Sequence, residues 1–215
     1  HTRYPLVTGV QTCALPIWSE SINQLLEQFE QINLGMSVET LTVVNDYVRW
    51  PSKLDKTKEL LDRWVKLGKQ KNWLLQLRIT PTCLTIHELD TVYEYAWENY
   101  LSVESCNFLY KPVFMRIDVL PKEYLTLAKN KLQLWINEHK EHTDLKIINI
   151  RDPNVARYQL LQDAQSYINY IDSVQDNTAQ LPDLIYYLKA IESNRNNSII
   201  DYIPQYEDIF RSAGY

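Results

Sequence analysis

Three polar side chains that lie close together in the sequence could bind a small ligand. Ser37 and Glu39 are two positions apart at the end of an apolar stretch, and Arg49 follows in the next loop. Hydroxyl and carboxylate groups can bond the hydroxyls of a ribose, and an arginine can bind a carboxylate through two parallel hydrogen bonds. The same residue types also serve structural roles, so the spacing alone leaves a binding site and a structural role open.

The sequence carries few signatures of other chemistry. With only four glycines, it has neither the G-x-G-x-x-G turn of dinucleotide-binding proteins nor a phosphate-binding loop. Cys83 and Cys106 are too far apart for paired metal ligands, and we expect buried, reduced thiols. His139 and His142 lie in a charged stretch and are expected at a solvated helix end. We therefore predict no metal ligand in this sequence.

Composition argues against several kinds of partner. The formal net charge is -5, and no run of five or more like charges occurs, so we expect neither nucleic acid nor an anionic membrane as partner. The sequence has no stretch of 18 or more apolar residues, so no membrane span is predicted. A hydrophobic fraction of 45% is typical of a globular protein, and reduced thiols favour a cytoplasmic location.

Residues 1–17 (HTRYPLVTGVQTCALPI) do not resemble part of a protein fold. Codon by codon, residues 7–17 back-translate into a common sequencing-library adapter. They also lack the basic start and apolar core of a secretory signal. We expect residues 1–17 to be a non-native, adapter-derived segment, and the native part, which begins at Trp18, to be a fragment that lacks its N-terminus.

Strands and helices are expected to alternate up to about residue 120. Apolar residues at three- and four-residue spacing indicate helices, and alternation of apolar and polar residues indicates strands. Gly68 is the expected left-handed end of one helix, and Thr85 with Glu88 is an expected capping box at the start of the next. The predicted elements are a helix over 19–30, a strand over 32–38, a helix over about 51–68, a strand over 73–80, a helix over about 85–101 and a strand over 105–113.

This alternation implies parallel strands joined by right-handed crossovers, as in α/β barrels and doubly wound sheets. In a barrel, ligand sites lie at the carboxyl ends of the strands, where Ser37 and Glu39 are expected. Gln76 and Arg78, on the second strand, would face the same cavity in one register and point outward in the other.

Helices dominate after residue 121. They are predicted over 122–139, 153–171 and 184–193, with a strand-like run over 145–150 and one or two short helices near the end. We therefore predict an α/β part over 18–120 and a helical C-terminal extension over 121–215.

The segment from Ser37 to Glu39, with the run from Tyr47 to Pro51 and the helix predicted after it, resembles the fourth strand and loop of radical S-adenosylmethionine (radical SAM) proteins. It is most similar to the twitch-domain-containing group of that superfamily. The runs over 109–124 and 188–204 resemble the C-terminal region of the same group, so the likeness covers essentially residues 18–215.

The resemblance implies a fold and a reaction. The fold is the C-terminal part of a partial (β/α)6 TIM-like barrel, followed by a mostly helical extension. In the family, a C-x3-C-x2-C loop holds a [4Fe-4S] cluster that binds and cleaves S-adenosylmethionine, and the resulting 5′-deoxyadenosyl radical abstracts hydrogen from a substrate. The implied partners are a reductant such as flavodoxin or ferredoxin and an unknown peptide or small-molecule substrate.

The resemblance also implies residue roles. Ser37 would contact the ribose or methionine part of the cofactor, Glu39 the ribose side and Arg49 the methionyl carboxylate, while Gln76 and Arg78 could line the same cavity. The cysteine loop and the glycine-rich motif that holds the methionyl amine are absent from this sequence. We therefore expect the full-length parent to be the enzyme and the chain as written to be inactive.

Two alternatives remain open from the sequence. Another α/β-barrel enzyme, a hydrolase or lyase, would also place Ser37 and Glu39 at the mouth of the barrel. A non-catalytic interaction protein would use the six tryptophans and 15 tyrosines as partner-facing surface. Many of these aromatic residues fall on apolar helix stripes, which favours a place in the core.

Overall fold

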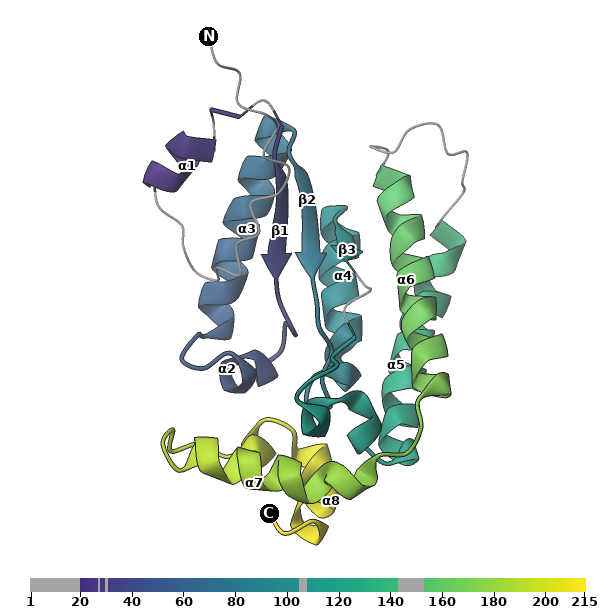
Figure 1. Cartoon of the computed structure of the whole chain (residues 1–215). Helices are drawn as coiled ribbons and strands as arrows, with labels where there is room; N and C mark the ends of the chain where they lie inside the picture. Colours follow the sequence, from purple (N-terminus) through teal and green to yellow (C-terminus); the bar gives the residue numbers. More distant parts are fainter. Residues whose placement is uncertain (1–19, 27, 30, 105–107, 143–152) are drawn as a thin grey trace.

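Strands and helices alternate in the first half of the chain (Figure 1). The computed structural model describes residues 20–26, 28–29, 31–104, 108–142 and 153–215, so residues 1–17 lie outside the described part. The elements of this half are α1 (Glu20–Leu26), β1 (Asn33–Ser37), α2 (Val44–Val48), α3 (Leu54–Lys71), β2 (Leu74–Arg78), α4 (Leu89–Asn99) and β3 (Ser102–Glu104). The chain is therefore an α/β protein, as predicted.

The three strands form one parallel sheet in the order β1-β2-β3. Each strand lies next to the strand that follows it in the sequence, and right-handed crossovers in this order place α3 and α4 on the same face. The register pairs Ser37 with Arg78 and Arg78 with Glu104. Residues from all three strands therefore meet in one row across the sheet.

The two faces of this sheet differ in polarity. Because successive side chains alternate between faces, one face carries buried apolar residues and the other carries polar ones. The apolar face lies against α3, where Leu75 packs under Gly68, and it consists of Leu34, Met36, Leu75, Leu77 and Val103. The polar face carries Asn33, Gly35, Ser37, Gln76, Arg78, Ser102 and Glu104, together with the exposed Leu74.

Helices make up the second half. They are α5 (Lys122–His139), α6 (Pro153–Ser173), α7 (Leu181–Glu192) and α8 (Glu207–Ser212). α5 and α6 pack on each other and on α4, and α6 also contacts β3. α7 and α8 lie across the end of the molecule toward which β1 and β2 point (Figure 1). Side chains from both sides of residue 120 share one hydrophobic core.

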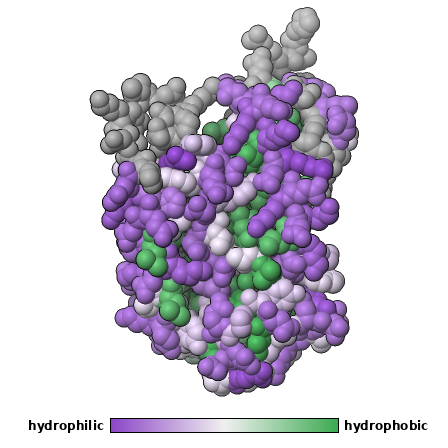
Figure 2. Space-filling model, turned by 180° about the vertical axis from the view of Figure 1, so that it is seen from behind, coloured by the Kyte–Doolittle hydropathy of each residue, from purple (hydrophilic) through white to green (hydrophobic). Residues whose placement is uncertain are grey.

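One face of the molecular surface is mostly polar (Figure 2). Seen from behind, it is largely hydrophilic, with apolar residues in smaller patches (Figure 2). None of the helices in the described ranges is long and apolar enough to cross a membrane.

The third strand lies earlier than the sequence predicted. β3 covers Ser102–Glu104, whereas the prediction placed it over 105–113, of which residues 105–107 lie outside the described part. The reason is the end of α4, where Tyr100 takes a left-handed conformation (φ 56°) and turns the chain before Leu101. Residues 113–115 form a 3-10 turn instead of the end of a strand. The strand-like run over 145–150 is also outside the described residues.

Two predicted helix boundaries are wrong. Gly68 does not end α3, because the left-handed residue is Asn72 (φ 55°), whose backbone N–H donates to the carbonyl oxygens of Gly68 and Lys69. Thr85 and Glu88 do not form a capping box. The Thr85 hydroxyl instead accepts from the backbone N–H of Thr82 at 3.0 Å, because residues 82–88 form a turn and a 3-10 helix before α4 begins.

Gly68 is required for close packing between α3 and β2. A Cβ at this position would lie 2.6 Å from the methyl groups of Leu75, so we expect Gly68→Ala to destabilise the fold by about 1–3 kcal/mol despite the better helix propensity of alanine. Urea unfolding measures this change. Gln70→Ala, at an exposed position of the same helix, is the control, and equal stability of both variants would contradict the packing argument.

Candidate functional site

The polar face of the sheet brings three of the predicted site residues together. Ser37, Gln76 and Arg78 share this face, so the register is the one that points Gln76 and Arg78 to the same side as Ser37. The Arg78 Nε lies 2.5 Å from Glu104 Oε2, and Gln76 Nε2 donates to the same oxygen at 3.4 Å. The face therefore presents hydroxyl, amide, guanidinium and carboxylate groups within two rows of the sheet.

Gly35 leaves room for this arrangement. A Cβ at Gly35 would lie 2.5 Å from Arg78 Nε and 2.8 Å from its Cδ, which means that the arginine side chain lies across the glycine. Only a residue without a side chain lets Arg78 take this path along the sheet toward Glu104. Sequence analysis did not single out Glu104, and its alternation with Ser102 around a buried Val103 is the signal that could have placed it on this face.

Glu39 and Arg49 form an ion pair with each other. Arg49 donates through Nε to Glu39 Oε2 and through Nη2 to Glu39 Oε1, the second contact at 2.7 Å. The Arg49 side chain is 20% exposed and the Glu39 side chain is 24% exposed. The sequence predicted that Arg49 could hold a ligand carboxylate in this bidentate way. In the structure it holds the carboxylate of Glu39, so a ligand would compete with Glu39 for the same donors.

The short helix α2, which the sequence analysis treated as a loop, positions Arg49. Asn45 is fully buried and its Nδ2 donates to Thr57 Oγ1 of α3 at 3.3 Å. Asp46 Oδ1 accepts from the backbone N–H of Leu54 at 2.6 Å, at the first residue of α3. The backbone N–H of Arg49 closes α2 by donating to the carbonyl of Asn45 at 2.9 Å.

The described residues do not fit an iron–sulfur cluster. Among them, no group of three or more His, Cys, Asp or Glu side chains could hold a metal ion. Cys83 is fully buried, as predicted for a structural thiol, and burial raises its pKa far above the ordinary range. A thiol held in its protonated form is a poor metal ligand. Cys106 lies outside the described residues.

His139 is not at a solvated helix end, contrary to the sequence prediction. Its side chain is 13% exposed, and its Nε2 lies 3.2 Å from Glu94 Oε2. The ring stacks on Trp135 with 4.6 Å between the ring centres and meets the edge of Trp97 at the same distance. His139 is the last residue of α5, but two tryptophans and a glutamate of α4 and α5 cover its ring. The side chain of His142 lies outside the described part.

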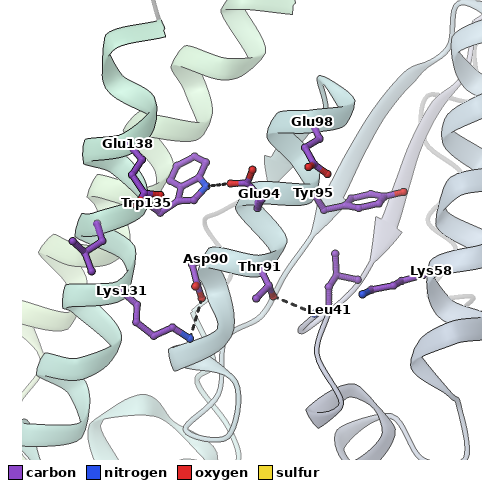
Figure 3. Close-up of a pocket in the computed structure, with 11 residues that line it drawn as sticks. Leu41, Lys58, Asp90, Thr91, Glu94, Tyr95, Glu98, Lys131, Trp135 and Glu138 are labelled. Atoms are coloured by element: carbon purple, nitrogen blue, oxygen red, sulfur yellow. Dashed lines mark hydrogen bonds and ion pairs between the residues drawn. The ribbon is translucent and has the colours of Figure 1, made fainter.

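A surface groove with a volume of about 600 Å³ lies next to Glu94 and Trp135 and away from the polar face of the sheet, between α3, α4 and α5 (Figure 3). Trp135 Nε1 donates to Glu94 Oε2 at 2.7 Å, and Lys131 Nζ lies 3.4 Å from Asp90 Oδ1. Burial raises the pKa of Asp90, and the Lys131 charge offsets part of that rise. The lining residues are Leu41, Lys58, Asp90, Thr91, Glu94, Tyr95, Glu98, Lys131, Leu134, Trp135 and Glu138.

This groove was not predicted from the sequence. Its signal was the acidic series Asp90, Glu94 and Glu98, which repeats every four residues and so lies along one side of α4. The groove belongs to the helical layer and lies on the opposite side of the sheet from the polar face, so its carboxylates do not join Ser37, Gln76 and Arg78.

Comparison with protein-family models, curated proteins and solved structures finds no match to this chain.

The Glu39–Arg49 pair should contribute to stability because both side chains are largely screened from water. We expect a double-mutant cycle with Glu39→Gln and Arg49→Gln to give a coupling free energy of about 1 kcal/mol in urea unfolding. The Glu59–Arg63 pair on the surface of α3 is the matched control and should give a smaller coupling. A Glu39–Arg49 coupling no larger than that of the control would contradict the expectation that partial burial strengthens this pair.

Proposed function

We propose that the parent of this chain is a radical SAM enzyme of the twitch-domain-containing type. In this proposal the chain contributes the last strands of a partial (β/α)6 barrel and the helical extension that follows. The observation that carries the proposal is the juxtaposition of Ser37, Gln76 and Arg78 on the polar face of a parallel sheet, with the Glu39–Arg49 pair in the segment that follows β1.

The order of the strands supports a barrel. In a (β/α) barrel, strands that follow each other in sequence are neighbours, their helices lie outside, and the opposite face of the sheet is the interior. β1, β2 and β3 follow this order, and the residues opposite the helical face are polar. A polar interior suits a barrel that encloses a ligand rather than one that is filled by apolar side chains.

The chemistry of the donors suits the parts of S-adenosylmethionine assigned by the resemblance. Ser37 and Gln76 offer a hydroxyl and an amide to the ribose and methionine groups. When Arg49 binds the methionyl carboxylate, Glu39 loses its partner, and its carboxylate becomes free to accept hydrogen bonds from the ribose hydroxyls. Ligand binding would thus exchange one ion pair for another, which limits the cost of desolvating the charges.

The cluster ligands belong, in this proposal, to a cysteine loop of the parent that is not part of this sequence. The cluster and S-adenosylmethionine together supply the 5′-deoxyadenosyl radical, while the residues of this chain bind and orient the cofactor. A reductant such as flavodoxin or ferredoxin, an unknown peptide or small-molecule substrate and a cytoplasmic location complete the proposal.

The coding sequence upstream of the Trp18 codon tests the family. Sequencing the DNA that encodes this chain, upstream of that codon, should show an in-frame C-x3-C-x2-C motif after a predicted strand and a glycine-rich turn after the next strand. Strands without a cysteine triplet, or a short leader alone, would refute the radical SAM proposal.

The full-length parent tests the residue roles. We expect Ser37→Ala and Arg49→Gln each to raise the Kd for S-adenosylmethionine about tenfold, because each removes a hydrogen bond worth about 1.4 kcal/mol to a polar or charged group. Equilibrium dialysis of the anaerobically reconstituted protein measures the Kd. Lys66→Ala, at an exposed position of α3, should leave it unchanged. Wild-type affinity in Arg49→Gln would remove Arg49 from the site.

A further inference from the structure

The carboxylate of Glu192, at the end of α7, accepts three hydrogen bonds from three different parts of the chain. Its Oε1 accepts from the hydroxyl of Tyr47 at 2.7 Å and from the backbone N–H of Ile199 at 2.6 Å. Its Oε2 accepts from the hydroxyl of Tyr215 at 2.6 Å. One carboxylate therefore joins α2, the 3-10 turn that begins at Ile199 and the last residue of the sequence.

Arg195 holds the same short helix from a second direction. Its Nη1 donates to the backbone carbonyl of Tyr47 at 3.1 Å, and its guanidinium lies 5.2 Å from the centre of the Trp50 ring, a cation–π distance. The ring of Tyr202 also lies 5.5 Å from that of Tyr47. The C-terminal extension therefore contacts residues on both sides of Arg49.

α2 needs such contacts because it is short. A helix of five residues has too few internal hydrogen bonds to be stable alone, so its position depends on what it packs against. Tyr47 is 1% exposed, and its hydroxyl donates to Glu192. If that acceptor is lost, the phenol must either stay buried without a partner or move, and Arg49, two residues later, moves with it.

We propose that Glu192 and Arg195 are positioning residues for the ligand site, because they hold α2 in the place from which Arg49 reaches Glu39. Tyr215 completes the network by holding the second oxygen of Glu192, so the end of the C-terminal extension supports a site at the other end of the sequence. The identity of the ligand rests on the proposed function, whereas the positioning itself is a property of this chain.

Amide hydrogen exchange of the 215-residue chain, followed by mass spectrometry, tests the positioning without any ligand. Glu192→Leu removes both acceptor oxygens, and we expect exchange in peptides covering residues 44–51 to become about tenfold faster or more, with α5 unchanged. Glu192→Gln keeps an oxygen that can accept from Tyr47 and Ile199, so it should restore most of the protection. Tyr186→Phe, at a 79% exposed position of α7, is the control and should behave as wild type.

Three results would overturn the proposal. Unchanged exchange over residues 44–51 in Glu192→Leu would show that the carboxylate does not hold α2. Equal acceleration throughout the chain, or no rescue by Glu192→Gln, would show a general structural role. If Glu192→Leu does not fold, Tyr215→Phe provides the milder test. It removes one donor to Glu192 and should accelerate exchange over residues 44–51 by a smaller factor, and the absence of any change there would also count against the proposal.

A second measurement separates this inference from the proposed function. In the full-length parent, Glu192→Leu should raise the Kd for S-adenosylmethionine in the same direction as Arg49→Gln and by no more, because the first displaces the guanidinium that the second removes. Wild-type affinity in Glu192→Leu would overturn the positioning role. If the wild-type parent does not bind S-adenosylmethionine while the exchange pattern is as expected, the proposed function fails and the positioning of Arg49 remains.

Discussion

The parallel pairing of β1, β2 and β3 determines where most other groups in the described part of the chain lie. The register sets Ser37 beside Arg78 and Arg78 beside Glu104, and the alternation of side chains sends Leu75 and Leu77 to the opposite face, into the core under α3. A shift of one residue would reverse both faces at once, burying charges and exposing leucines. The hydrophobic core and the polar face therefore depend on the same backbone hydrogen bonds.

The charges of the candidate site are paired before any ligand binds. Arg78 lies against Glu104, and Arg49 donates to Glu39. Each pair keeps a charged group from standing alone in a partly buried place, which would be costly. In the proposed function, the same pairing means that a ligand would be selected by exchange, because it would have to offer an acid to an arginine and polar hydrogens to the released carboxylate. A purely apolar ligand offers neither and would leave both pairs intact.

Local sequence patterns predicted the elements better than their ends or their partners. The helix predicted over 122–139 has the bounds of α5, Lys122 to His139, and the alternation over 32–38 located β1. Gly68 and Thr85 were misassigned because packing against Leu75 and a turn around Thr82 decided their roles. The alternation around Val103 could have placed Glu104 on the polar face, but its pairing with Arg78, 26 residues earlier, and that of Glu192 with Tyr47, 145 residues earlier, were out of reach, because no local pattern encodes such contacts.

The bond between Tyr47 and Glu192 has a consequence for biosynthesis. These residues are 145 positions apart, and a ribosome that adds about 5–20 residues per second needs roughly 7–30 seconds to pass from one to the other. During that time β1, α3 and β2 can emerge and pack together, while Tyr47 in α2 still lacks the acceptor for its hydroxyl. The candidate site is therefore expected to be among the last parts of the nascent chain to acquire its final shape, and contacts of such high sequence separation also slow refolding in the test tube.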